Sequence, residues 1–142
     1  MQTEERFIYL HSIAQIALRT HINHALAKAG AKVTLAQAGI LFLLEARDMQ
    51  KMSELGEAIR VDNSAMTRVI DRMEKNGLVE RVVDPKNRRA IHIRLTAKGR
   101  VAEGKARRII QSANEEIKSG FSQREIDAYR KVLEGILKKF GD

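Results

Sequence analysis

The order of patterns between Ser53 and Leu95 constrains the fold more than any other feature of this chain. A short helical pattern is followed by a break, by a second helical pattern that ends at Asn76-Gly77, and by two strand-like runs. From Met66 to Met73 the apolar residues recur at i, i+3, i+4 and i+7, which is the spacing of one buried helix face. We therefore expect a helix, a turn, a second helix and one small β-hairpin.

Capping signals delimit the helices around this segment. Residues 4–29 contain no Gly or Pro and repeat apolar residues at helical spacing until Gly30, so they predict one long helix. Thr34 and Gln37 form a capping-box pattern ahead of a helix over Leu35–Ala46. The other helices have expected N-terminal caps at Ser53, Asp62, Thr96 and Ser122. The fold is predicted to be mainly α, with the hairpin as its only β element.

The hairpin is predicted to carry a basic loop. Leu78–Val83 and Ile91–Leu95 are expected to be its strands, because the second run alternates apolar and polar residues. Pro85 cannot donate to a ladder, so we expect residues 84–90 to leave the sheet as a loop. Within this loop one acid, Asp84, is outnumbered by three cations, which are Lys86, Arg88 and Arg89.

Composition limits the classes of function. The 142 residues are 44% hydrophobic and 31% charged, as in a folded single domain. The formal net charge of +8 favours a polyanionic partner such as nucleic acid. Because there is no Cys, disulfides, thiol redox sensing and thiolate metal sites are excluded. The acidic N-terminus and the short longest apolar run, Ile40–Leu44, predict a soluble cytoplasmic protein without a membrane partner.

The outward side of the second helix is suited to reading DNA. Ser64 and Thr67 can donate or accept at base edges or phosphates, and Arg68 and Arg72 can reach guanine edges or the backbone. A solvated surface helix would carry similar residues, and a cationic loop can occur without function. We favour DNA recognition because the polar helix and the basic hairpin are consecutive segments that pack against one another.

The sequence resembles the MarR family of bacterial transcriptional regulators over nearly its whole length. The stretches that match in order and spacing are Ser53-Glu54-Leu55-Gly56, residues 63–81, Asp84-Pro85-Lys86-Asn87-Arg88-Arg89-Ala90 and Leu95-Thr96-Ala97-Lys98-Gly99. The resemblance implies a single domain over residues 1–142, with a winged helix-turn-helix at 31–100. Within it, the helix-turn-helix would span about 53–76 and the wing about 78–95. Residues 1–30 and 101–142 would be dimerisation helices, and their apolar surface exceeds what the central lobe needs for its own cover.

The resemblance also implies the residues that contact double-stranded DNA. They are Asn63, Ser64, Ala65, Thr67, Arg68, Arg72, Lys86, Arg88 and Arg89. Ser64, Thr67 and Arg68 are expected in the major groove, and either Arg88 or Arg89 in the minor groove. Asn87 departs from the family pattern, in which Asp usually precedes the arginine pair. Since Asn can hydrogen-bond but cannot form an ion pair, we expect a more mobile wing.

The implied function is that of a ligand-responsive repressor, a homodimer that binds a pseudo-palindromic operator, with a small-molecule effector of unknown identity as a further partner. The alternative is a winged-helix protein-protein interaction module without specific DNA binding, which should expose apolar anchors. No catalytic motif is present, so neither an enzyme nor a cofactor is expected. His21 and His24 could bind a metal, but paired helical histidines are more often surface or interface residues, and no metal site is expected.

Overall fold

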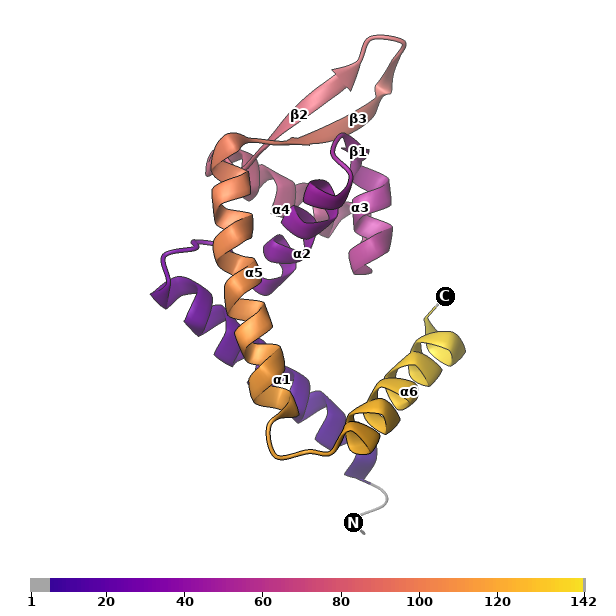
Figure 1. The fold of residues 1–142 in the computed structure, drawn as a ribbon. Coiled ribbons are helices and arrows are strands. Elements are labelled where there is room, and N and C mark those ends of the chain that lie inside the picture. Colours follow the sequence, from indigo (N-terminus) through magenta and orange to yellow (C-terminus); the bar gives the residue numbers. More distant parts are fainter. Residues whose placement is uncertain (1–5, 142) are drawn as a thin grey trace. The chain divides into compact units, whose positions relative to one another are not determined.

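The structure is a computed structural model in which residues 6–141 are described. The chain forms two compact units, the first ending at Ile110 and the second beginning at Gln111. The elements are α1 (Phe7–Lys28), α2 (Leu35–Ala46), β1 (Gln50–Lys51), α3 (Met52–Ile59), α4 (Asn63–Lys75), β2 (Val79–Asp84), β3 (Asn87–Leu95), α5 (Ala97–Lys118) and α6 (Gln123–Phe140) (Figure 1). This mainly helical order with one hairpin confirms the predicted fold class. Positions 4 and 5 of the expected first helix lie outside the described residues.

The core of the first unit lies among α2, α3, α4 and the base of the sheet. Full burial of a Leu, Ile or Met side chain stabilises a fold by about 1.5–3 kcal/mol. The apolar stripe of α4 faces inward as its spacing predicted. The largest fully buried side chains are Leu26, Ile40, Leu41, Leu44, Leu55, Met66, Ile70, Met73, Val79 and Ile93. This packing holds α4 against the unit and leaves its opposite face in solvent.

Most of the predicted caps are present. The Thr34 hydroxyl accepts the Gln37 N–H at 3.2 Å, and the Gln37 side chain accepts the Thr34 N–H at 3.0 Å. The Asp62 carboxylate accepts the Ala65 N–H at 2.8 Å, which fixes the start of α4. Thr96 and Ser122 accept in the same way at the starts of α5 and α6. These side chains satisfy amides that have no partner within their helix.

The predicted cap at Ser53 is wrong, because α3 begins one residue earlier, at Met52, and its N-cap residue Lys51 makes no side-chain capping bond. The reason is a short strand that the sequence pattern did not indicate. Gln50 and Lys51 form β1, which pairs antiparallel with β3 and gives a three-stranded sheet in the order β1-β3-β2. The buried Gln50 side chain donates to the Leu43 carbonyl at 2.7 Å, which ties β1 to α2.

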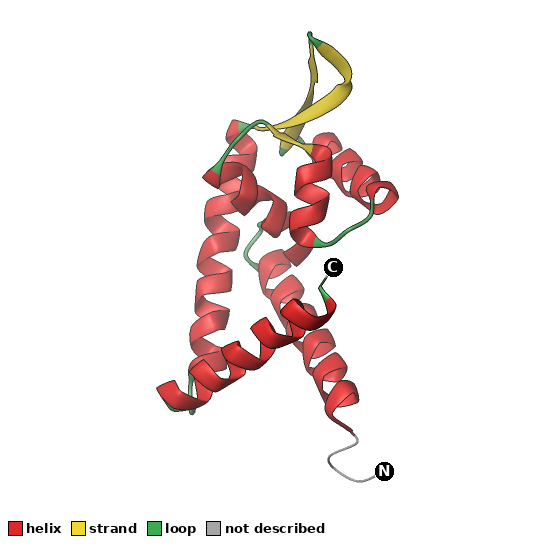
Figure 2. Cartoon of the chain, turned by 90° about the vertical axis from the view of Figure 1, so that its right-hand side faces the viewer, coloured by secondary structure: helices red, strands yellow, loops and turns green. Residues whose placement is uncertain are grey.

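The wing differs from the prediction in the length of its loop. Among the described residues the strands lie only at this end of the first unit, and the β2-β3 hairpin extends beyond the helices (Figure 2). Its turn contains only Pro85 and Lys86, because Asp84 still pairs with Asn87 after a bulge. Arg88 and Arg89 therefore lie on β3, not in a loop over residues 84–90. The Asp84 carboxylate accepts the Lys86 N–H at 2.8 Å and stabilises this short turn.

Each unit leaves apolar side chains in solvent. On α1 in the first unit, six large apolar residues are between 54% and 75% exposed, namely Phe7, Ile8, Tyr9, Leu10, Ile13 and Ile16. In the second unit α6 has no buried residue, and its exposed apolar side chains are Tyr129, Val132, Leu137 and Phe140. Between residues 6 and 141 no helix combines the length and apolar character required for a membrane span.

Candidate nucleic-acid interface

The exposed face of α4 carries most of the predicted site. Asn63 is its first residue, directly after the Asp62 cap. Ala65 is half-buried, whereas five predicted residues are exposed, namely Asn63, Ser64, Thr67, Arg68 and Arg72. The Thr67 hydroxyl donates to the Asn63 carbonyl at 2.9 Å, so its lone pairs remain free to accept. The apolar face fixes the helix while the polar face presents donors outward, as groove recognition requires.

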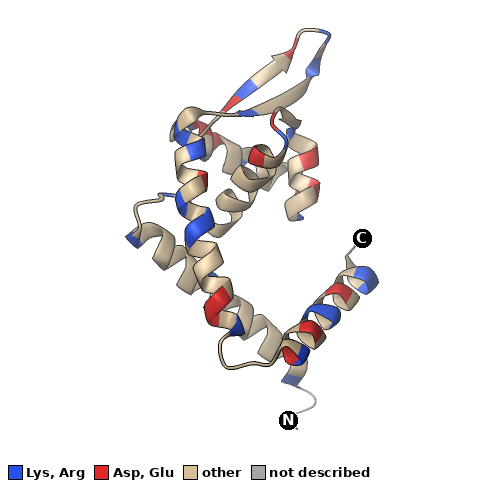
Figure 3. Cartoon of the chain, in the orientation of Figure 1, with Lys and Arg blue, Asp and Glu red and all other residues tan. Residues whose placement is uncertain are grey.

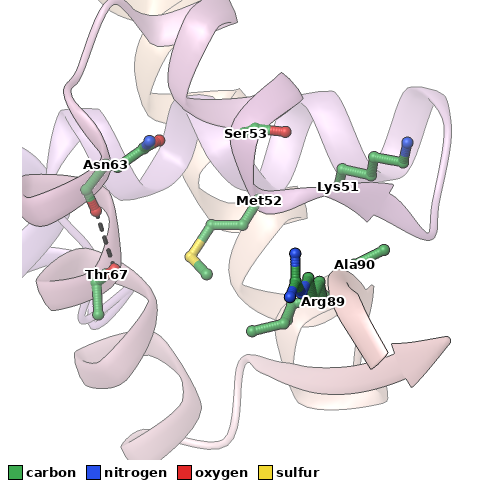
Figure 4. A pocket seen from close by; sticks show the side chains of 8 residues that line it. Lys51, Met52, Ser53, Asn63, Thr67, Arg89 and Ala90 are labelled. Carbon is green, nitrogen blue, oxygen red and sulfur yellow. Dashed lines mark hydrogen bonds between the residues drawn. The ribbon is translucent and has the colours of Figure 1, made fainter. Parts of the chain in front are cut away.

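The wing brings a cation beside the start of α4. A hollow of about 200 Å³ lies between them, and its walls are Lys51, Met52, Ser53, Asn63, Thr67, Arg89, Ala90 and Ile91. Figure 4 shows Arg89 reaching from β3 on the side opposite Asn63 and Thr67. Arg88 and Lys86 are exposed, and neither contributes to this wall. The structure thus brings together Asn63, Thr67 and Arg89 of the predicted set.

Two wall residues, Lys51 and Ser53, are absent from the predicted set. Both are exposed, and β1 carries Lys51 to the edge of the hollow because it pairs with His92 of β3. A two-residue strand has no alternating pattern, so its pairing could not be predicted from local sequence. The one signal in the sequence that could have indicated these two residues was the Lys-x-Ser spacing at a helix start. A helix N-terminus with a cation beside it favours binding of an anion such as phosphate.

The cations of the first unit fall into a paired and an unpaired group. Arg47 pairs with Glu54, Arg94 with Glu80, Arg100 with Glu45, and Arg81 with Asp71 and Glu74. By contrast, within residues 6–141 no carboxylate pairs with the side chains of Arg68, Arg72, Lys86, Arg88 and Arg89. Figure 3 shows Lys and Arg positions on the wing next to its few acids. The predicted DNA-contact cations thus all belong to the group that no carboxylate of the described residues neutralises.

This arrangement can bind a polyanion. Exposed guanidinium and ammonium groups release counterions from a phosphate backbone, and the α4 donors can reach base edges. Across the described part of the chain no three His, Cys, Asp or Glu residues are grouped so that they could hold a metal ion. The geometry is therefore that of a binding surface made of a helix and an adjacent hairpin.

Comparison with known proteins agrees with this geometry. Residues 33–91 match the MarR family, a range that includes α2 to α4 and most of the wing. Two curated relatives from Bacillus subtilis strain 168 are similar. The uncharacterized HTH-type transcriptional regulator YkoM is 38% identical over 60 residues, and the HTH-type transcriptional repressor MdtR is 39% identical over 67 residues. The alignments cover 42% and 47% of this chain, and the chain spans only 39% and 43% of the relatives' length.

A solved structure extends the likeness to the whole fold. The transcriptional repressor CouR bound to a 23-mer DNA duplex superimposes with a TM-score of 0.85 at 24% identity. The superposition covers 94% of this chain and 93% of CouR. Residues 33–91 are thus similar in sequence to the MarR family at the helix-turn-helix and wing, and the agreement in fold extends over nearly the whole chain.

Proposed function

We propose that this chain is a sequence-specific DNA-binding transcriptional regulator. The observation that carries the proposal is the exposure of five cations on α4 and near the wing tip that have no carboxylate partner among residues 6–141, namely Arg68, Arg72, Lys86, Arg88 and Arg89. In this proposal α4 lies in the major groove with Ser64, Thr67 and Arg68 at base edges. Arg89 lies beside α4 and enters the adjacent minor groove, while Arg88 and Lys86 contact backbone phosphates.

Asn63, Ala65 and Arg72 complete the proposed contact set. Asn63 sits at the helix N-terminus, where the backbone amides favour a phosphate. Ala65 is half-buried and offers a methyl group toward the groove, and Arg72 lies one turn beyond Arg68. Lys51 and Ser53 add phosphate contacts from the opposite wall of the hollow. No catalytic step is part of this function.

The proposed active form is a homodimer on a pseudo-palindromic operator. Residues 31–100, which we call the head, would read one half-site of the operator. Residues 1–30 and 101–142 would form the contacts between the two chains, and each chain would be a single domain. The exposed apolar side chains of α1 and, separately, of α6 support this division, since such surfaces mark protein contacts. Two heads related by a twofold axis read half-sites about one helical turn apart.

We further propose that the protein is a repressor that responds to a small molecule and works in the bacterial cytoplasm. MdtR is described as a repressor, and CouR is known both with duplex DNA and with p-coumaroyl-CoA. A ligand would shift the dimer away from its DNA-binding form if it bound more tightly to a spacing of the two heads that does not fit the operator. The resemblance to these proteins supports the class of regulation without naming the ligand.

Selection from a random duplex library tests the proposal. We expect enrichment of a pseudo-palindrome with half-sites about 10 base pairs apart, bound with an affinity that falls steeply as salt rises. Arg68→Ala should abolish the enrichment. Arg94→Ala is the matched control, because the Arg94 guanidinium already pairs with Glu80. Equal, weak binding of all duplexes would overturn the proposal and favour a protein-protein interaction module.

A further inference from the structure

One ion-pair cluster connects the wing to the recognition helix α4. Arg81, on β2, donates from Nη1 to Glu74 Oε1 at 2.8 Å and from Nη2 to Asp71 Oδ1. Its backbone N–H also donates to Glu74 Oε2, at 2.9 Å. Both carboxylates belong to α4. Three hydrogen bonds therefore join a single wing residue to the last two turns of that helix.

The cluster differs from the other ion pairs in the head. The Arg81 side chain is 23% exposed, whereas Arg94, Arg100 and Arg47 are between 53% and 69% exposed. Partial burial lowers the pKa of Arg81, but Asp71 and Glu74 more than compensate, so this pKa lies above its ordinary value. The guanidinium is permanently charged and is held bidentately by its two partners, a geometry that fixes orientation as well as distance.

Because Arg81 lies far from the tip of the wing, a small rotation of the strand at Arg81 moves the tip by a large distance. Arg81 lies four residues before Pro85, so the turn is about 13 Å farther along the strand. A rotation of roughly 10° at Arg81 would move the turn by about 2 Å. Binding constellations tolerate errors of only about 0.5 Å or 10–20°. The angle between β2 and α4 therefore decides whether helix and wing can contact one duplex together.

Other contacts hold the wing at its base and through β3, whose residues Ile93 and His92 pair with β1. The Leu78 N–H donates to the Met73 carbonyl at 2.9 Å, and the Thr96 hydroxyl donates to the Gly77 carbonyl at 2.6 Å. Val79 is buried. Among the described residues, the hydrogen bonds that join β2 beyond Val79 directly to α4 are those of Arg81.

We propose that Arg81 is a positioning residue that locks the wing at the angle to α4 at which both contact the same DNA. The inference rests on the proposed function, and it concerns coupling between two contact sites rather than the contacts themselves. Loss of Arg81 leaves α4 free to bind while the wing contributes little. The proposal is therefore tested by the contribution of the wing cations to DNA affinity, measured with and without Arg81.

A double-mutant cycle measures that quantity. Dissociation constants for the selected duplex are compared for the full chain, for the wing variant Arg88→Ala/Arg89→Ala, and for both in an Arg81→Leu background. We expect the wing variant to weaken binding about tenfold alone, and less than about threefold when Arg81→Leu is present. Arg68→Ala should weaken binding by the same factor in both backgrounds, so that only the wing contribution falls; a general loss of folding would leave both factors unchanged.

Two controls keep the result specific. Arg94→Ala removes an ion pair confined to the wing, between Arg94 and Glu80, and should leave the tenfold wing effect unchanged. Asp71→Asn/Glu74→Gln breaks the lock from the α4 side and should reproduce the effect of Arg81→Leu even if that variant folds poorly. A full tenfold wing effect without Arg81 or its carboxylates overturns the inference. If neither the wing variant nor Arg68→Ala alters binding to the selected duplex, the proposed function itself fails.

Discussion

Gly99 allows α5 to approach the base of the wing so closely that a methyl group cannot be added. Gly99 is the third residue of α5 and is buried. A Cβ built on it would lie 2.1 Å from the Leu78 carbonyl oxygen and 2.7 Å from Leu95 Cδ1, whereas real Cβ contacts are essentially never under 3.0 Å. Because the nearest atom belongs to the backbone, Gly99→Ala forces α5 and the Leu78 backbone apart.

The magnitude follows from this separation. The difference between 3.0 Å and 2.1 Å requires a displacement of 0.9 Å, and overpacking of this kind costs about 1–3 kcal/mol. The displacement also stretches the bond from the Thr96 hydroxyl to the Leu78 carbonyl, now 3.0 Å, a bond of the kind that contributes about 1 kcal/mol. Alanine regains up to about 1 kcal/mol of helix propensity. We therefore expect Gly99→Ala to lower the free energy of unfolding by about 1–3 kcal/mol.

Urea unfolding followed by circular dichroism measures the change, with protein concentration held fixed because the proposed dimer would contribute to stability. Gly104→Ala is the matched control on the same helix, since a Cβ there meets nothing within 4 Å. It should raise the free energy of unfolding by about 0.5–1 kcal/mol. Equal stabilities of the two variants would refute the close approach of α5 to Leu78.

Three further predictions concern the start of α4, the groove contacts and the dimer. Asp62→Ala removes the bond to the Ala65 N–H and should lower the free energy of unfolding by about 1 kcal/mol, which urea titration measures; Asp62→Asn should retain most of that stability. In binding titrations at several salt concentrations, Lys86→Ala should weaken binding to all duplexes about equally and reduce the slope of log affinity against log salt by about one. Arg68→Ala should instead relax base preference. The opposite pattern would reverse the two roles. Leu137→Asp replaces an exposed apolar side chain of α6 by a charged one and should convert the proposed dimer to monomers in light scattering. Lys131→Asp on the same helix should not have this effect. If the Leu137→Asp variant remains dimeric, the interface lies elsewhere.

The helices could be predicted because their signals are local. The Thr34 capping box and the Asp62 cap act within one turn, and the Met66–Met73 spacing describes a single face. The structure contains all three. The residues of α4 that point into solvent follow directly from that buried face, so the helical part of the candidate site was accessible from sequence.

The errors arose where distant segments meet. Residues Gln50–Lys51 form a strand only because β3 lies beside them. For this reason the start of α3 differs from the prediction, and Lys51 and Ser53 were not among the predicted site residues. Pro85 predicts a loop over residues 84–90, yet it occupies a turn position where it need not donate to the ladder. The Arg81 cluster joins residues seven and ten positions apart, and no spacing rule pairs a strand residue with a preceding helix.

The two-residue turn at Pro85–Lys86 has a consequence for the kinetics of binding. Ordering a flexible backbone costs about 1–2 kcal/mol per residue, and a wing loop over residues 84–90 would lose that entropy on meeting DNA. Here Val83 pairs with Ile91 and Asp84 pairs with Asn87, so Arg88 and Arg89 lie in a short bulge that is closed by paired residues at both ends. Encounter with DNA then has only this short bulge to order, and the association rate is governed mainly by diffusion and by the attraction between the unpaired cations and the phosphates.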